Sequence, residues 1–306
     1  MSTPVLEVID LKKTYKRGFR AQPVHALRGV SFSIQPGTIT GFLGANGAGK
    51  TTTIKCILEL SMATSGKILY FGREGLTNDA KSRIGFLPER PYFYEYLTGR
   101  EFLKFYGQLS KDTKSSILNE RVSQLLKRVG LEQAGDRPLR SYSKGMLQRV
   151  GIAQALVHHP EFIILDEPQT GLDPDGRFEV REIIRETAGE GTAVFFSSHL
   201  LNDAEQLCRD LIIYKQGELV YSGTTQNLIG QAGTGFRITF TANGKIQTLD
   251  ATDAADLQKA IDKVRAQGSE IQEIRPLRQS LEEIFIRIGF DGKTKPAAID
   301  QQGTRL

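Results

Sequence analysis

The segment GANGAGKT, residues 44–51, places glycines, a lysine and a threonine in the pattern G-x-x-x-x-G-K-[ST]. This pattern is typical of a loop that binds phosphate, because glycines let backbone N–H groups converge on an anion without side chains in the way. Lys50 can bridge the β- and γ-phosphates of a nucleotide, and Thr51 can bind Mg²⁺. A strand-like segment before the loop and a helix-like segment after it favour phosphate binding over a glycine turn without a ligand. The residues that we expect to contact the nucleotide here are Gly44, Ala45, Asn46, Gly47, Ala48, Gly49, Lys50, Thr51 and Thr52.

Two acids, Asp166 and Glu167, end the apolar segment FIILDE, which is predicted to be a buried strand. Asp166 then lies where its carboxylate can reach the Mg²⁺. Glu167, one residue further, can polarise a water for attack on the γ-phosphate. The alternative is a pair of acids that cap the next helix, but paired carboxylates there are costly to desolvate.

A histidine, His199, ends the next apolar segment, TAVFFSS at residues 192–198. It is expected at the same edge of the sheet, where it can donate to the γ-phosphate or hold the water and base in line. The other three histidines, His25, His158 and His159, are interpreted as surface or helix-end residues.

Strands alternate with helices along the chain, which predicts an α/β fold with a largely parallel sheet. Ligands bind such sheets at the carboxyl ends of their strands, which is where the residues above are found. Residues 98–132 have apolar positions at helical spacing and are predicted to be a helical insert. After about residue 226 the pattern indicates a small separate α/β unit.

The motifs and their order resemble the nucleotide-binding subunit of an ATP-binding cassette (ABC) transporter over roughly residues 5–225. GANGAGKT is similar to the family's Walker A loop, FIILDE to Walker B, GLDP to the D-loop and SSH to the switch-histidine motif. The resemblance implies a P-loop NTPase cassette with a mainly parallel sheet core, an antiparallel β subdomain and a helical subdomain at about residues 90–160. It also implies ATP and Mg²⁺ as cofactors. It assigns Tyr15 as the aromatic residue that stacks on adenine, and the alternative is a surface tyrosine. It also assigns Asp173, in the D-loop, to the nucleotide site.

The segment YSKGM, residues 142–146, stands where the family has its Leu-Ser-Gly-Gly-Gln signature. Ser143 matches the serine and Gly145 the second glycine, while Lys144 replaces the first glycine. The segment keeps a hydroxyl and a helix N-terminus that can bind an anion. In the family these groups contact the ATP that the other subunit holds. The alternative is a plain serine helix cap. This form of the signature also resembles the branch of cassettes that serve polymer, lipid and drug exporters.

Two further departures concern Glu89 and Gln169. Glu89 stands where most of the family has the Q-loop glutamine, and it can still reach Mg²⁺, although its charge repels phosphate. Gln169 stands where the family has threonine or serine. The aromatic segment PYFYEYLT, residues 91–98, is either a groove for a helix of a membrane partner or core packing of the helical insert.

Composition fits a folded protein, with 39% hydrophobic and 25% charged residues and a net charge of +5. We find no secretory signal and no apolar run long enough to span a bilayer, and two cysteines are too few for a disulfide framework. We therefore expect a cytoplasmic protein, peripheral on the inner face of the membrane. The expected domains are a cassette at residues 1–225, an accessory unit at 226–289 and a flexible tail at 290–306.

One cassette per chain implies, by the resemblance, a homodimer that closes around two ATP and drives a separate integral-membrane permease. Two alternatives remain: a cassette that does mechanical work on a membrane complex, such as lipoprotein extraction, and a soluble cassette acting on ribosomes or DNA. Translation cassettes usually have two cassettes in one chain and DNA-repair cassettes a longer insert, so no nucleic-acid partner is expected.

Overall fold

The computed structural model describes residues 3–16, 22–109, 115–231, 234–242, 245–278 and 280–290. The chain divides into two compact units, Met1–Ser222 and Gly223–Leu306. The first unit contains two sheets and the second contains one, and each unit has its own hydrophobic core.

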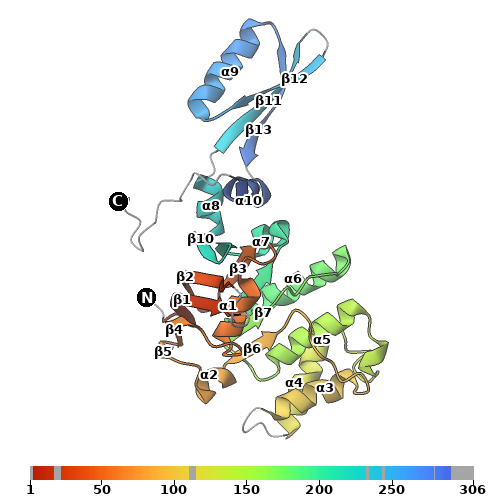
Figure 1. Ribbon diagram of the computed structural model, residues 1–306. Helices are drawn as coiled ribbons and strands as arrows, with labels where there is room; N and C mark the ends of the chain where they lie inside the picture. The colour runs from red at the N-terminus through yellow and green to blue at the C-terminus, as the bar shows by residue number, and fades with distance from the viewer. Residues whose placement is uncertain are drawn as a thin grey trace. The chain divides into compact units, whose positions relative to one another are not determined.

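A six-stranded sheet forms the centre of the first unit, with the order β10-β9-β3-β8-β7-β6 (Figure 1). Its strands are β3 (Ile39–Gly44), β6 (Ile84–Leu87), β7 (Phe162–Leu165), β8 (Ala193–Ser198), β9 (Asp210–Lys215) and β10 (Glu218–Thr224). The pairs that join β6, β7, β8, β3 and β9 are all parallel. All residues of β7 and β8 are buried, which explains their nearly continuous apolar sequences. The predicted parallel α/β sheet is confirmed.

Helices connect these strands and pack on them. They are α1 (Lys50–Ile57), α2 (Asn78–Ser82), α6 (Pro174–Gly189) and α7 (Leu201–Leu207). Because successive parallel strands enter the sheet at the same edge, every strand-to-helix turn lies at the opposite, carboxyl edge. The ends of β3, β7 and β8 therefore meet there.

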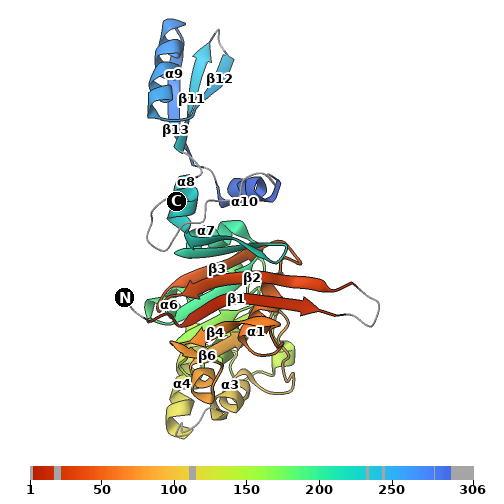
Figure 2. The same cartoon turned by 60° about the vertical axis from the view of Figure 1, so that its left-hand side comes forward.

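A second, antiparallel sheet packs against the first, with the order β2-β1-β4-β5. It contains β1 (Leu6–Tyr15), β2 (Val24–Ile34), β4 (Ser65–Tyr70) and β5 (Arg73–Glu74). The two sheets meet through aromatic side chains: the Phe32 ring lies 6.0 Å from that of Phe195 and 6.3 Å from that of Phe42. β1 and β2 continue beyond this core as a two-stranded ribbon (Figure 2).

The helical subdomain is an insert between β6 and β7. It contains α3 (Gly99–Gln108), α4 (Ser115–Arg128), a 3₁₀ turn η1 (Leu139–Ser141) and α5 (Lys144–Leu156). Thr98 and Glu101 form a reciprocal capping box that fixes the start of α3. Buried apolar residues at helical spacing, such as Phe102 and Leu125, hold α3 and α4 together.

The second unit contains a three-stranded antiparallel sheet with the order β12-β11-β13. Its elements are α8 (Thr225–Gln231), β11 (Thr234–Ala242), β12 (Lys245–Ala251), α9 (Ala254–Ala266), β13 (Glu270–Arg278) and α10 (Leu281–Phe290). Helix α9 covers one face of the sheet, burying Ile238 and Phe240 against Val264 (Figure 1). The predicted tail at 290–306 lies outside the described residues, apart from Phe290. No helix in the described ranges combines the length and apolar character that crossing a bilayer requires.

Candidate active site

A cavity of about 790 Å³ opens at the carboxyl edge of the six-stranded sheet. It is large enough for a nucleotide-sized ligand. The residues that line it come from β2, the glycine loop, the segment after β6, the turn after β7, the end of β8 and the β9–β10 turn. They are Val24, His25, Ala26, Arg28, Ala45, Asn46, Gly47, Gly49, Lys50, Thr51, Thr52, Glu89, Glu167, Thr170, His199 and Gln216.

The glycine loop leads directly from β3 into the cavity and ends at the N-terminus of α1. Gly49 is the N-cap of α1, with φ 109°. An added Cβ at Gly49 would lie 2.9 Å from the Ala26 carbonyl oxygen, so only glycine fits both the backbone conformation and the space. Nothing lies within 4 Å of an added Cβ at Gly47, where the loop faces open space. The loop therefore presents backbone N–H groups and a helix N-terminus to the cavity.

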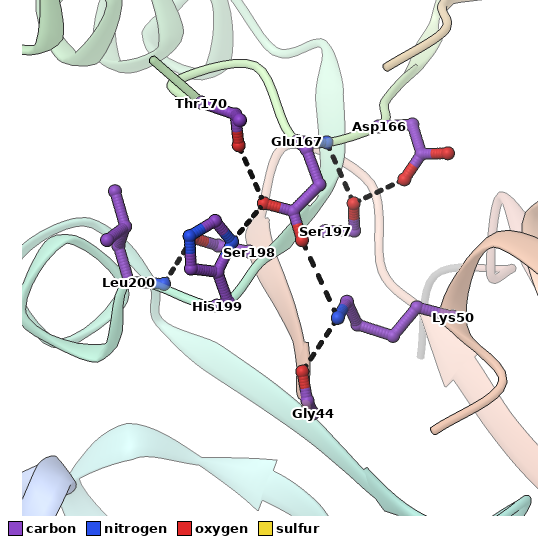
Figure 3. A network of polar contacts seen from close by, with 9 residues as sticks. All are labelled: Gly44, Lys50, Asp166, Glu167, Thr170, Ser197, Ser198, His199 and Leu200. Carbon is purple, nitrogen blue, oxygen red and sulfur yellow. Dashed lines mark hydrogen bonds and ion pairs between the residues drawn. The ribbon is translucent and has the colours of Figure 1, made fainter. Parts of the chain in front are cut away.

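Lys50 and Glu167 meet inside this cavity (Figure 3). The Lys50 ammonium donates to the Gly44 carbonyl oxygen at 2.7 Å and lies 3.5 Å from Oε1 of Glu167. Both side chains are shielded, with 7% and 11% of their surfaces exposed. A lysine and a carboxylate are thus held side by side in the cavity, next to the glycine loop.

Asp166 and Glu167 point in different directions because the chain turns sharply between them. Glu167 has φ 52°, in the left-handed region that glutamate rarely adopts. Ser197 of β8 fixes this turn: its hydroxyl accepts from the Glu167 N–H at 2.8 Å and donates to Oδ1 of Asp166 at 2.6 Å. Burial raises the pKa of the Asp166 carboxyl, and the Ser197 hydrogen bond counteracts that rise.

His199 lies on the other side of Glu167. Its Nδ1 is 2.7 Å from Oε2 of Glu167, and a carboxylate oxygen accepts, so Nδ1 donates. The Thr170 hydroxyl donates to the same Oε2 at 3.1 Å. The Glu167 carboxylate therefore contacts a lysine through one oxygen and two hydrogen-bond donors through the other.

The side chains near Asp166 suit Mg²⁺. Thr51 is close enough to Asp166 to lower the pKa of its carboxyl, and Glu89 is close enough to raise it. Within the described ranges no three His, Cys, Asp or Glu side chains cluster as a complete metal site. Magnesium is commonly held by one or two carboxylates together with substrate phosphates and water, so this partial set of oxygens fits the ion.

The residues carried over from the signature do not line this cavity. Ser143 is the N-cap of α5, and its hydroxyl accepts from the Met146 N–H at 3.2 Å. Lys144 extends to the D-loop, where an added Cβ on Gly171 would overlap its ammonium. Gly145 is the second residue of α5.

Asp173 and Tyr15 are also outside the lining of the cavity. The Asp173 carboxylate accepts from the Gly176 N–H at 3.0 Å and so caps α6. Tyr15 ends β1 opposite Val24, which does line the cavity, and the Lys13 ammonium lies 4.8 Å from the Tyr15 ring centroid.

Several lining residues were not anticipated from the sequence. Arg28 and His25 lie in a part of β2 that the pattern did not predict as strand, and Gln216 occupies the turn before Gly217. Thr170 lies directly before the GLDP motif, and no sequence pattern assigns it a role. The structure places it three residues after Glu167, in a turn closed by a 3.2 Å hydrogen bond from the Thr170 N–H to the Glu167 carbonyl oxygen.

Gln169 is buried beside this site, with 2% of its surface exposed. Neither of its amide atoms has a hydrogen-bond partner among the residues that the structure describes. A buried amide without partners is unfavourable, so we expect Gln169 to be less stabilising here than an apolar side chain.

A family model described as ABC transporter matches residues 27–170. An uncharacterized ABC transporter ATP-binding protein of Nostoc is 41% identical, the match covering 93% of this chain and 90% of the relative. The bacitracin transport ATP-binding protein of Bacillus licheniformis is 40% identical over 72% of this chain and 69% of its own. The structure of cbiO1 from Clostridium perfringens, part of an ABC transporter complex, gives a TM-score of 0.66 at 28% identity and covers 76% of this chain and 92% of its own.

Proposed function

The chain belongs to the ABC transporter family as an ATP-binding, ATP-hydrolysing subunit, and on that premise we propose that Glu167 is the general base of hydrolysis. The observation that carries this proposal is the position of its carboxylate, in the cavity and 3.5 Å from the ammonium of Lys50. Lys50, at the end of the glycine loop, binds the phosphates, and the helix N-terminus beside it adds positive potential.

In the proposed reaction a water attacks the γ-phosphorus while the bond from that phosphorus to the ADP oxygen breaks. Glu167 accepts a proton from the attacking water. His199 donates from Nδ1 to Glu167 and so orients the base. Its other ring nitrogen remains available to the substrate.

The nucleotide is held by the glycine loop and by Thr51 and Thr52 at the start of α1. Tyr15, beside the mouth of the cavity, provides a ring for adenine. Thr51, Asp166 and Glu89 would hold Mg²⁺, which when bound supplies positive charge to the phosphate oxygens.

We propose that two copies share each ATP. Ser143, Lys144, Gly145 and Asp173 lie outside their own cavity, which supports a role on a nucleotide held by the second copy. Ser143 and Lys144 at the N-terminus of α5 are exposed, so this helix end is accessible to an anion held by another chain.

We propose that ATP hydrolysis drives an integral-membrane permease, which the chain contacts at the inner face of the membrane. Aromatic side chains in the helical subdomain support a docking surface: Tyr92 and Tyr96 are 80% and 73% exposed, and Phe105 is 41% exposed. The Tyr94 ring bridges them, with its centroid 5.8 Å from that of Tyr92 and 5.6 Å from that of Phe105. Exposed aromatic patches of this kind mark protein contacts.

Export is the proposed direction of transport, because the YSKGM form of the signature resembles the exporter branch of the family. The second unit, Gly223–Leu306, is proposed to be an accessory domain of the dimer.

The proposal for Glu167 is tested by Glu167→Gln. The variant should bind ATP as the wild type does, since the amide keeps the shape of the side chain, but its turnover should fall by roughly a thousandfold or more, since an amide is a poor proton acceptor. Phosphate release and equilibrium binding of a fluorescent ATP analogue measure the two properties.

Glu161→Gln is the matched control, because Glu161 lies at the other end of β7 and pairs with Arg83 at 2.6 Å. It should retain turnover. Normal hydrolysis by Glu167→Gln would contradict the assignment of Glu167 as the base.

A further inference from the structure

Thr170 is a cavity residue whose hydroxyl is directed at the proposed base rather than at open space (Figure 3). It donates to Oε2 of Glu167 at 3.1 Å, and His199 donates to the same oxygen at 2.7 Å. We propose that Thr170 is a positioning residue: with His199 it anchors Oε2 of Glu167, so that Oε1 is the oxygen that takes the proton from water. This inference rests on the proposed function of Glu167.

The two oxygens of the Glu167 carboxylate have different surroundings. Oε1 faces Lys50 at 3.5 Å, on the side of the carboxylate opposite Thr170 and His199 (Figure 3). When the Lys50 ammonium binds phosphate instead, Oε1 loses its neighbour and can accept a hydrogen bond from water. Oε2 keeps both donors, because neither Thr170 nor His199 needs to move for this exchange.

Thr170 can act in this way because the backbone places it close to the base. The chain turns between Glu167 and Thr170, and the Thr170 N–H donates to the Glu167 carbonyl oxygen at 3.2 Å. A glutamate side chain has three rotatable bonds, and a single donor would leave its carboxylate free to rotate about that contact. Two donors from different elements, the turn after β7 and the end of β8, fix the plane of the carboxylate.

The test compares ATP hydrolysis by the full-length wild type, Thr170→Val and Thr170→Ser. Valine has the shape of threonine without the hydroxyl, and serine keeps the hydroxyl. Loss of one hydrogen bond to a charged group predicts that Thr170→Val lowers kcat by roughly tenfold. The KM for ATP should change by less than about twofold, because Thr170 does not hold the phosphates. Thr170→Ser should retain most of the activity.

Thr192→Val is a matched control, since Thr192 lies at the other end of β8, where its hydroxyl donates to the Pro160 carbonyl oxygen at 3.2 Å. It should hydrolyse ATP as the wild type does. Thr170→Val should not lower kcat any further in a Glu167→Gln chain, because the carboxylate that Thr170 positions is gone.

Wild-type kcat in Thr170→Val overturns the positioning role and leaves the base assignment intact. A serine variant as impaired as the valine variant also overturns it, since the hydroxyl would not be the cause. Normal turnover in Glu167→Gln overturns the base assignment itself, and the positioning role with it. The three results are distinguishable in one set of assays.

Discussion

Glu167 shows how a single residue is placed by the strand before it, the strand beside it and a strained backbone. Its φ of 52° is unfavourable for glutamate by about 1–2 kcal/mol, and the Ser197 hydroxyl of the neighbouring strand offsets part of this strain. The strain separates Asp166 from Glu167, so that one acid faces Ser197 and Thr51 while the other faces Lys50. Two adjacent acids therefore serve two different purposes.

Gln169 is a buried polar residue that we expect to lower the stability of the protein. Because both of its buried amide atoms lack partners in the described part of the chain, Gln169→Met should raise the free energy of unfolding by about 1 kcal/mol. Chemical denaturation measures the change.

Thr187→Val is the contrasting control. Thr187 is equally buried, but its hydroxyl donates to the Ile183 carbonyl oxygen and accepts from Arg128, so its removal should lower stability by about 1–2 kcal/mol. A loss of stability in Gln169→Met would show that its amide has a partner, such as a buried water.

The sequence predicts the residues at this edge of the sheet better than it predicts their contacts. Lys50, Glu167 and His199 each follow an apolar strand, so their convergence could be anticipated from the pattern. The direction of the Thr170 hydroxyl could not, because it depends on the left-handed backbone of Glu167 three residues earlier. Threonine after a strand has no pattern that distinguishes it from a surface residue.

At the scale of elements, the signature turn and the D-loop contact each other within one chain. Lys144 at the start of α5 lies over Gly171, which precedes the start of α6. Arg149 of α5 also pairs with Glu179 of α6 at 3.4 Å. The element proposed to bind the second copy's ATP is thus connected to the turn that holds Glu167.

Gly171→Ala tests whether the backbone conformation of Gly171 or its contact with Lys144 requires glycine in this turn. Gly171 has φ 72°, so alanine should lower the free energy of unfolding by about 1–2 kcal/mol. The added methyl also meets Lys144, but that contact is with the flexible end of a side chain and is easily relieved. The double variant with Lys144→Gly should therefore remain destabilised in chemical denaturation. Full recovery in the double variant would show that the lysine contact, and not the backbone, limits this position.

Element boundaries were predictable where strands are buried on both faces and less so at the antiparallel sheet. β7 and β8 were recognised as continuous apolar runs. The alternating segments VLEVI at residues 5–9 and VSFSI at residues 30–34 predict two short strands, whereas β1 reaches Tyr15 and β2 begins at Val24. The additional segments are mostly exposed or half-buried, and register shifts interrupt their alternation, so only the cross-strand pairing reveals them.

For the whole molecule, all the residues that line the cavity belong to the first unit, Met1–Ser222. That unit binds and hydrolyses ATP, but the signature residues lie outside its own cavity. We therefore propose that ATP brings two chains together, with Ser143 of each on the nucleotide of the other.

Sedimentation of Glu167→Gln with and without ATP tests this claim most directly. Slow hydrolysis should let ATP hold the closed dimer, so the mass should rise from the 33.9 kDa of one chain to about twice that value. Ser143→Arg in the same chain should still bind ATP but remain at the mass of one chain, because a bulky cation replaces the small cap. A Glu167→Gln chain that is saturated with ATP and still sediments as a single chain would contradict ATP-dependent dimerisation.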